Sequence, residues 1–136
     1  MDPKALVREL LERTAVGPFD ALKGKVADDF VLRLPYAPPG APNKLRGFAR
    51  AKEVISGDQQ GKQSFAWHDV VTLQTEDPEL FVTTARSEVV MRSGQPYAND
   101  YIMLTRIRYG VIVEHCVYFN PLPLVKALGQ DGKHPA

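Results

Sequence analysis

The sequence predicts one α+β domain, in which N-terminal helices pack on the concave face of a curved, cone-shaped antiparallel sheet. Two observations predict this class. Helical patterns occupy the first half of the chain, and strand-forming runs separated by short turns occupy the second half. Helices followed by a meander of strands is an order typical of α+β domains. The 136 residues suit a single domain, which we expect at residues 1–129, with a disordered tail at 130–136.

The first helix has the clearest boundaries. Asp2 and Pro3 form a typical start, because an aspartate side chain caps the first turn and proline fits the first helical position. Apolar residues at helical spacing continue to about residue 15, and Gly17-Pro18 interrupts the pattern. The other elements expected in this half are helices at 19–26 and 48–55, an extended run at 30–34, and a proline-rich rim loop at 35–42.

The second half is expected to hold four strands and a short terminal helix, at residues 65–75, 80–92, 97–108, 111–119 and 124–128. Tyr109-Gly110 is typical of a two-residue hairpin turn, which would place Leu104 opposite His115. On this register the more aliphatic face of the hairpin should face the helices. It carries Asp100, Ile102, Leu104, Arg106, Val113, His115, Val117 and Phe119.

The opposite face of this hairpin is also rich in apolar side chains. It carries Asn99, Tyr101, Met103, Thr105, Ile107, Ile112, Glu114, Cys116 and Tyr118. Such a face is too apolar to be covered by solvent alone, so a second subunit should cover part of it. The sequence therefore predicts a homodimer.

The overall composition argues against several classes of function. Seventeen basic and 16 acidic residues are scattered along the chain with a net charge of +1, which argues against nucleic-acid binding. No membrane span or signal peptide is expected, because no apolar stretch is long enough. With Cys116 as its single cysteine the chain can form no internal disulfide, so we expect a cytoplasmic location. No residue set has the spacing of a metal site or phosphate loop, so no metal or cofactor is predicted.

His115 is the leading candidate for chemistry. An inward imidazole among aliphatic residues could act as a base or hydrogen-bond donor, or it could be a core histidine bonded to a backbone carbonyl. Asp100 shares the predicted inner face and could contact the far end of a ligand or be a solvated rim charge. His68 could contact a ligand or lie at an interface, and Tyr36 could reach the cavity mouth or pack within its loop.

Several segments resemble a known superfamily: residues 97–101 (YANDY), 106–115 (RIRYGVIVEH) and 118–121 (YFNP). They are similar to the SnoaL-like branch of the nuclear transport factor two-like superfamily, which has the ketosteroid isomerase-like fold. Trp67, residues 75–81 (TEDPELF) and the segment from Asn120-Pro121 to residue 129 most resemble the phenazine-biosynthesis A/B proteins. The resemblance covers about residues 5–129 and implies a cystatin-like α+β barrel with a pocket.

Departures from these relatives bear on the mechanism. The phenazine-biosynthesis proteins have a glutamate where this chain has Val117, and a histidine on the third helix where it has Val54. Loss of both groups argues against phenazine-type condensation, whereas His115 matches the Glu-His pair common in SnoaL-like chains. The relatives also carry polar pocket groups near Arg86 and Glu88. Alternation alone turns these two side chains outward, and a one-residue change of register would reverse them.

Two functions fit these expectations. The first is a cofactor-independent isomerase, cyclase or dehydratase that acts by acid-base chemistry on a small, mostly apolar carbonyl compound. Its catalytic candidates are His115, Asp100 and Glu88, and its substrate-binding candidates are Tyr36, Arg86, His68, Leu104, Val117 and Phe119. The second is a non-catalytic small-molecule binder or accessory protein, which Val117 favours because a binder needs only apolar walls and a few polar anchors.

Overall fold

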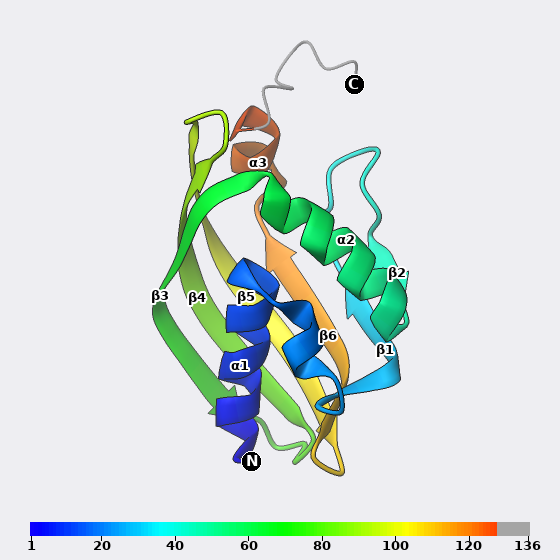
Figure 1. Cartoon of the computed structure of the whole chain (residues 1–136). Helices are drawn as coiled ribbons and strands as arrows, with labels where there is room; N and C mark the ends of the chain where they lie inside the picture. The colour runs from blue at the N-terminus through cyan, green and yellow to red at the C-terminus, as the bar shows by residue number, and fades with distance from the viewer. Residues whose placement is uncertain (128–136) are drawn as a thin grey trace.

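The computed structural model describes residues 1–127, so the predicted tail at 130–136 lies outside the described residues. Figure 1 shows the arrangement of its elements. The helical elements are α1 (Pro3–Val16), the 3-10 turn η1 (Phe19–Leu22), α2 (Phe48–Gln60) and α3 (Pro121–Ala127). The strands are β1 (Val26–Arg33), β2 (Lys44–Arg46), β3 (Lys62–Gln74), β4 (Leu80–Met91), β5 (Pro96–Arg108) and β6 (Val111–Phe119).

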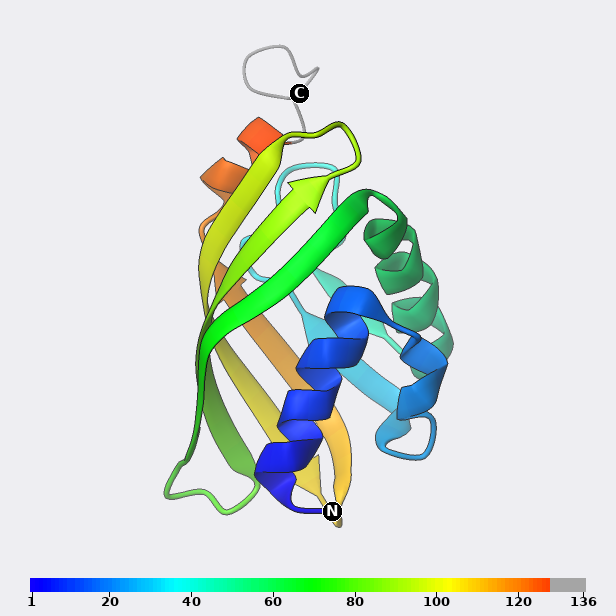
Figure 2. The ribbon, with the colours of Figure 1, turned by 60° about the vertical axis from the view of Figure 1, so that its left-hand side comes forward.

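The strands form one curved sheet in the order β2-β1-β6-β5-β4-β3. Strands β3 to β6 form the predicted antiparallel meander, and α1 and α2 lie on the side toward which the sheet curves (Figure 2). The α+β class and the cone-like shape are therefore confirmed. The sheet is mixed, however, because β1 runs parallel to β6 and Leu32 pairs with His115. Hairpin turns in the sequence could not predict this long-range pairing.

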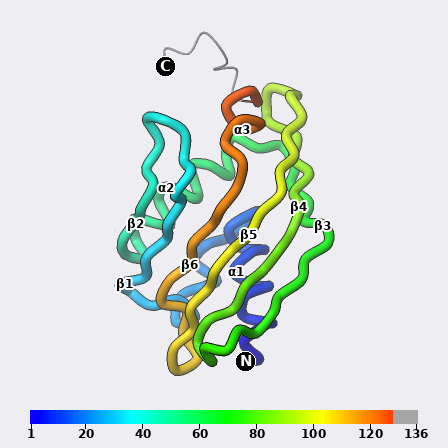
Figure 3. The backbone as a smooth tube through the Cα atoms, turned by 180° about the vertical axis from the view of Figure 1, so that it is seen from behind, coloured from blue at the N-terminus to red at the C-terminus, as the bar shows by residue number. Residues whose placement is uncertain are grey.

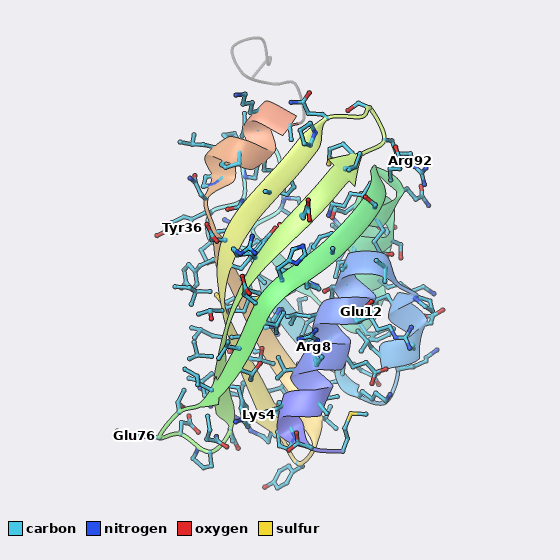
Figure 4. The ribbon with its side chains drawn as sticks, turned by 90° about the vertical axis from the view of Figure 1, so that its left-hand side faces the viewer. Lys4, Arg8, Glu12, Tyr36, Glu76 and Arg92 are labelled. Atoms are coloured by element: carbon cyan, nitrogen blue, oxygen red, sulfur yellow. The ribbon has the colours of Figure 1, made fainter. Side chains whose placement is uncertain are left out.

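Helix α1 begins as predicted. The Asp2 carboxylate accepts a hydrogen bond from the backbone N–H of Ala5 at 3.1 Å, and Pro3 occupies the first turn. The apolar stripe faces the core and consists of Leu6, Val7, Leu10, Leu11 and Ala15. The opposite stripe is exposed, as the labelled side chains in Figure 4 show: Lys4, Arg8 and Glu12.

Two side chains tie the helices to the sheet and to each other. The indole Nε1 of Trp67 on β3 donates a hydrogen bond to the carbonyl of Leu11 on α1 at 3.1 Å. Near the end of α2, the Gln59 amide Nε2 donates to the carbonyls of Arg13 and Thr14 at 2.8 and 3.0 Å. These bonds reinforce the last turn of α1 and hold both helices over the concave face of the sheet.

The region after α1 differs from the predictions. The expected helix at residues 19–26 is only the turn η1, because Gly24 has a φ of +81° and Val26 already begins β1. The sequence does not predict the short strand β2, which pairs antiparallel with β1 after the proline-rich loop. A strand of only three residues is too short to show a recognisable alternation, so β2 cannot be identified without knowing that it pairs with β1.

Two other helices are longer than predicted. Helix α2 passes through Gly57, because glycine inside a helix costs only about 1 kcal/mol and the bonds of Gln59 hold the final turn. Helix α3 begins at Pro121, because the side chain of Asn120 accepts a hydrogen bond from the Leu122 backbone N–H at 3.0 Å. Within residues 1–127, no helix is long and apolar enough to cross a membrane.

A β-bulge in β6 determines which side chains of the last hairpin face inward. Ile107 pairs with Ile112, but the next pair along the ladder is Arg106 with Glu114. Val113 is therefore an extra residue on β6. An extra residue in one strand changes the alternation of side chains between the two faces of the sheet.

The bulge corrects the predicted register by one residue. Thr105, rather than Leu104, lies opposite His115. The inner face of β6 carries His115, Val117 and Phe119, as the sequence predicts. On β5 the predicted faces are reversed, because the turn-based register took no account of the bulge. The inner side chains of β5 are Tyr97, Asn99, Tyr101, Met103, Thr105 and Ile107.

Figure 3 shows the sheet from behind, on the side away from α1 and α2. This outer face carries two rows of mostly apolar side chains. The first row is Val71, Thr84, Ile102 and Tyr118, and the second is Leu73, Val82, Leu104 and Cys116. Ile102 and Leu73 are more than half exposed, at 53% and 55%. The β5 side chains expected at a subunit interface are thus inside the domain, and a different apolar surface lies outside. We call these two rows the outer apolar rows.

Candidate functional site

A cavity of about 270 Å³ lies between the concave face of the sheet and the helices. The proline-rich loop after β1 borders it, in agreement with its expected position at a rim. Apolar side chains dominate the walls and include Leu32, Val54, Trp67, Met103, Val117 and Phe119. The polar side chains that reach the cavity are Thr14, Asp58, Lys62, Tyr97, Tyr101 and His115.

His115 is held in the cavity wall by β6 and is only 3% exposed. Its Nδ1 lies 2.8 Å from the hydroxyl Oγ1 of Thr105, which is itself fully buried. Burial lowers the pKa of His115 from 6.5 to about 4, because the charged imidazolium is poorly solvated there. The imidazole is therefore neutral at neutral pH. Depending on the tautomer of the ring, Nε2 can donate one hydrogen bond to a ligand or accept one from it.

A chain of hydroxyl groups forms a second polar feature of the cavity. The hydroxyl of Tyr101 lies 3.0 Å from that of Ser87 and 3.5 Å from that of Tyr97. The amide Nδ2 of Asn99 donates to the Tyr97 hydroxyl at 2.9 Å, which leaves the Tyr97 proton free to point elsewhere. Burial raises the pKa of Tyr101 far above its ordinary value, so its hydroxyl stays protonated. These hydroxyls suit a ligand oxygen.

An ion pair forms the third polar feature. The Lys62 Nζ lies 2.6 Å from the Asp58 Oδ2, and both residues line the cavity. The Lys62 side chain is 13% exposed, whereas that of Asp58 is 60% exposed. The ammonium also lies 5.4 Å from the centre of the Phe65 ring, a distance at which a cation is attracted to an aromatic face. Within residues 1–127, no group of three His, Cys, Asp or Glu side chains could hold a metal ion.

The structure brings three of the predicted site residues into the cavity: His115, Val117 and Phe119. Leu104 faces outward because of the bulge in β6. Tyr36 is 56% exposed, and its ring packs edge-on against Tyr118 with ring centres 5.8 Å apart. Figure 4 shows Tyr36 at the margin of the molecule, away from α1. Tyr36 therefore does not line the cavity.

Four other predicted residues, Asp100, Glu88, Arg86 and His68, lie together on the outer face. The His68 Nε2 is 2.9 Å from the Glu88 Oε1. Arg86 lies opposite Asp100 in the strand ladder, and its Nε donates a hydrogen bond to Asp69 at 2.7 Å. Strands β4 and β5 pair without a bulge, so the alternation that turns Arg86 and Glu88 outward is correct. The family resemblance implied that Arg86 and Glu88 lie in the pocket, and the structure shows that this expectation is wrong.

Sequence reasoning missed five of the six polar cavity residues, including Thr14 near the end of α1. Tyr97 and Tyr101 were hidden by the register error, because the bulge places them on the inner face. Asp58 and Lys62 lie in the polar stretch that follows the helix expected at residues 48–55. Their spacing of four residues is the only signal that could have suggested an ion pair.

The curved sheet with helices on its concave face is the fold of an NTF2-like protein from Burkholderia xenovorans, which superposes with a TM-score of 0.74 at 15% identity, covering 90% of this chain and 92% of the other. A protein of Pseudomonas aeruginosa, the uncharacterised PhzA/B-like protein PA3332, is 33% identical over 103 residues. These residues are 73% of this chain and 70% of that protein. The chain therefore belongs to the PhzA/B-like proteins. No protein-family model matches it.

Solved structures agree on the fold. A proposed isomerase from Bacillus subtilis superposes with a TM-score of 0.80 at 23% identity, covering 92% of this chain and 91% of the other. The phenazine biosynthesis-related protein PhzB2 of Pseudomonas aeruginosa gives 0.74 at 17% identity, covering 95% and 86%. IdmH, a proposed polyketide cyclase from Streptomyces antibioticus, gives 0.73 at 22% identity, covering 95% and 99%. At these identities the likeness concerns the fold alone.

Proposed function

We propose that this protein binds a small, mostly apolar molecule inside the cone. The observation that carries the proposal is the cavity itself, whose walls are apolar while a few polar side chains converge on it. Cavities of this composition are typical of small-molecule sites. Val54 and Val117 both line the cavity, so apolar side chains stand where the resemblance implies an acid-base pair.

The ligand should carry at least one oxygen. Tyr97 and Tyr101 offer hydroxyl donors, and the neutral imidazole of His115 offers one further hydrogen bond. A buried donor left without a partner costs about 1–3 kcal/mol, so a ligand that supplies a carbonyl or hydroxyl oxygen is favoured over a hydrocarbon. The proposed ligand is therefore a mostly apolar carbonyl or hydroxyl compound.

The test uses Trp67, which lines the cavity and is the only tryptophan of the chain. A panel of small ketones, aldehydes and alcohols is titrated while tryptophan fluorescence is recorded. Val117→Phe should fill the cavity and weaken binding at least tenfold, because the added ring occupies the ligand volume. Val16→Phe, at the exposed end of α1 and outside the cavity lining, is the matched control and should bind like the wild type. Equal binding by both variants would contradict the proposed site.

A second candidate is a cofactor-independent enzyme that isomerises, cyclises or dehydrates such a compound. It is favoured by one observation: a carboxylate, Asp58, and a neutral imidazole, His115, line the same cavity. Asp58 would remove a proton next to the carbonyl, and His115 or Tyr101 would hydrogen-bond the oxygen on which negative charge develops. A pKa of about 4 suits His115 to this donor role better than to that of a base.

Deuterium uptake separates the enzyme from the binder. Each ketone that binds is incubated with the protein in D₂O, and exchange of the hydrogens next to its carbonyl is followed by NMR. The enzyme should accelerate exchange, and Asp58→Asn should abolish the acceleration. Asp28→Asn, which alters an exposed acid outside the cavity, is the control. Absence of exchange for every bound ketone would leave binding as the function.

We also propose that the protein acts in the cytoplasm as a homodimer. The single, buried Cys116 suits a reducing compartment. The outer apolar rows offer a surface for a second copy of the chain.

A further inference from the structure

We propose that the ligand is an amphiphile with a carboxylate end, and that Lys62 binds this carboxylate. The inference rests on the proposed binding function and specifies the chemical class of the ligand. Among the described residues that line the cavity, Lys62 is the only lysine or arginine, and the other basic side chain, His115, is neutral at neutral pH. The cavity thus has a single, localised preference for negative charge.

The ion pair of Lys62 with Asp58 is asymmetric in its burial. The Lys62 side chain is almost withdrawn from water, and its position is held by the Phe65 ring beneath its ammonium group. The Asp58 carboxylate is mostly exposed and can turn into solvent at little cost. An ammonium group in poor contact with water requires a nearby anion. A carboxylate that enters from the cavity can therefore take the place of Asp58.

The position of Lys62 also determines how such a ligand would lie. Lys62 follows the C-terminal end of α2, which Figure 1 shows at the same end of the molecule as α3 and the loop between β1 and β2. The carboxylate would sit at this end, beside the exposed Asp58. The apolar body would extend along β5 and β6 toward Met103, Val117 and His115. A charged group near water and an apolar body in the cone match the polarity of the two regions.

The experiment compares octanoate, which is ionised at neutral pH, with octanamide, its neutral analogue of nearly the same shape. Both are titrated against the full chain, and Trp67 fluorescence reports binding. The wild type should bind octanoate about five- to tenfold more tightly than octanamide, the size expected of one partly buried ion pair. Lys62→Met should reduce this ratio to about one. Lys44→Met, which changes an exposed lysine outside the cavity, should keep the wild-type ratio.

The variant Asp58→Asn removes the competing carboxylate and should bind octanoate several-fold more tightly, with no change for octanamide. Lys62→Gln serves as a second variant if Lys62→Met does not fold, as judged by circular dichroism. An unchanged ratio in the folded Lys62 variant, or weaker octanoate binding by Asp58→Asn, would overturn carboxylate recognition while leaving the binding function intact. Failure of both probes to bind a wild type that does bind the ketones, aldehydes or alcohols would overturn this inference alone, whereas failure of that panel as well would overturn the binding function.

Discussion

At the scale of single residues, His115 combines deep burial with a titratable group. Its imidazole is neutral in the folded protein because burial holds its pKa at about 4, while an unfolded chain would titrate near 6.5. As the pH falls below about 6.5, the unfolded state gains a proton that the folded state does not. The contribution of this group to stability is therefore present at neutral pH and is lost as the pH falls toward 4.

The direction of this pH dependence leads to a prediction for His115→Gln. Between pH 7.5 and 5, the shifted pKa of His115 should remove about 2 kcal/mol from the free energy of unfolding of the wild type. The variant lacks the titrating group, so its free energy should fall less over the same range. Urea unfolding of both proteins at several pH values measures the difference between their free energies of unfolding. The carboxylates that both proteins share affect both values equally and so cancel in this difference. Parallel pH profiles would contradict the lowered pKa.

Single residues also limit how much of the site can be predicted. Next to the turn the predicted faces are reversed, because Ile107 and Ile112 lie inside. The bulge in β6 reverses the faces of that strand once more, so His115, Val117 and Phe119 lie inside as predicted. Tyr97 and Tyr101 are misplaced because Val113 carries no signal that distinguishes an extra strand residue from a paired one. The position of a bulge depends on both strands of a pair, and a single sequence does not reveal how they pair.

At the scale of elements, the walls of the cavity depend on the contact between α1 and α2. The amide of Gln59 provides two hydrogen bonds across this contact, to the carbonyls of Arg13 and Thr14. Thr14 and Ala15 line the cavity, so the last turn of α1 forms part of its wall. Helix start signals predict α1 well, because Asp2 and Pro3 act locally. The contact between the helices is tertiary and could not be predicted from local pattern.

Gln59→Ala should therefore destabilise the protein. Loss of two partly buried hydrogen bonds should cost about 1–2 kcal/mol, even though alanine favours the helix. Gln60→Ala changes the exposed neighbouring side chain and should be neutral or slightly stabilising. Thermal unfolding followed by circular dichroism compares the two. A loss of stability that is equal in both variants would show that the side-chain bridge of Gln59 contributes nothing.

At the scale of the whole molecule, the sequence predicts the fold class better than the packing of its faces. The order of helices and strands is enough to indicate a cone, because a long antiparallel meander must bury one face. The sequence also predicts that an apolar surface lies on the outside of the sheet. The β5 residues assigned to that surface, however, lie on the inner face of the domain. The outer apolar rows, centred on Ile102 and Leu104, are the surface that the structure leaves exposed.

We predict that the outer apolar rows form the interface of a homodimer. Ile102→Asp should convert the dimer into a monomer, because two buried carboxylates would face each other or lose their hydration. Val16→Asp alters a residue at the end of α1 that is similarly exposed, at 52%, and should leave the dimer intact. Light scattering at micromolar concentration measures the mass. A wild type with the mass of one chain would contradict the prediction.

The two valines in the cavity wall, Val54 on α2 and Val117 on β6, have a consequence for protein engineering. Each is only partly buried and packs at the edge of the core rather than inside it. A larger polar side chain can therefore be accommodated at either position at the expense of cavity volume. Replacing Val117 with glutamate and Val54 with histidine would place an acid and a base in the wall of the same mostly apolar cavity. The chain is thus a scaffold on which acid-base catalysis could be installed with two substitutions.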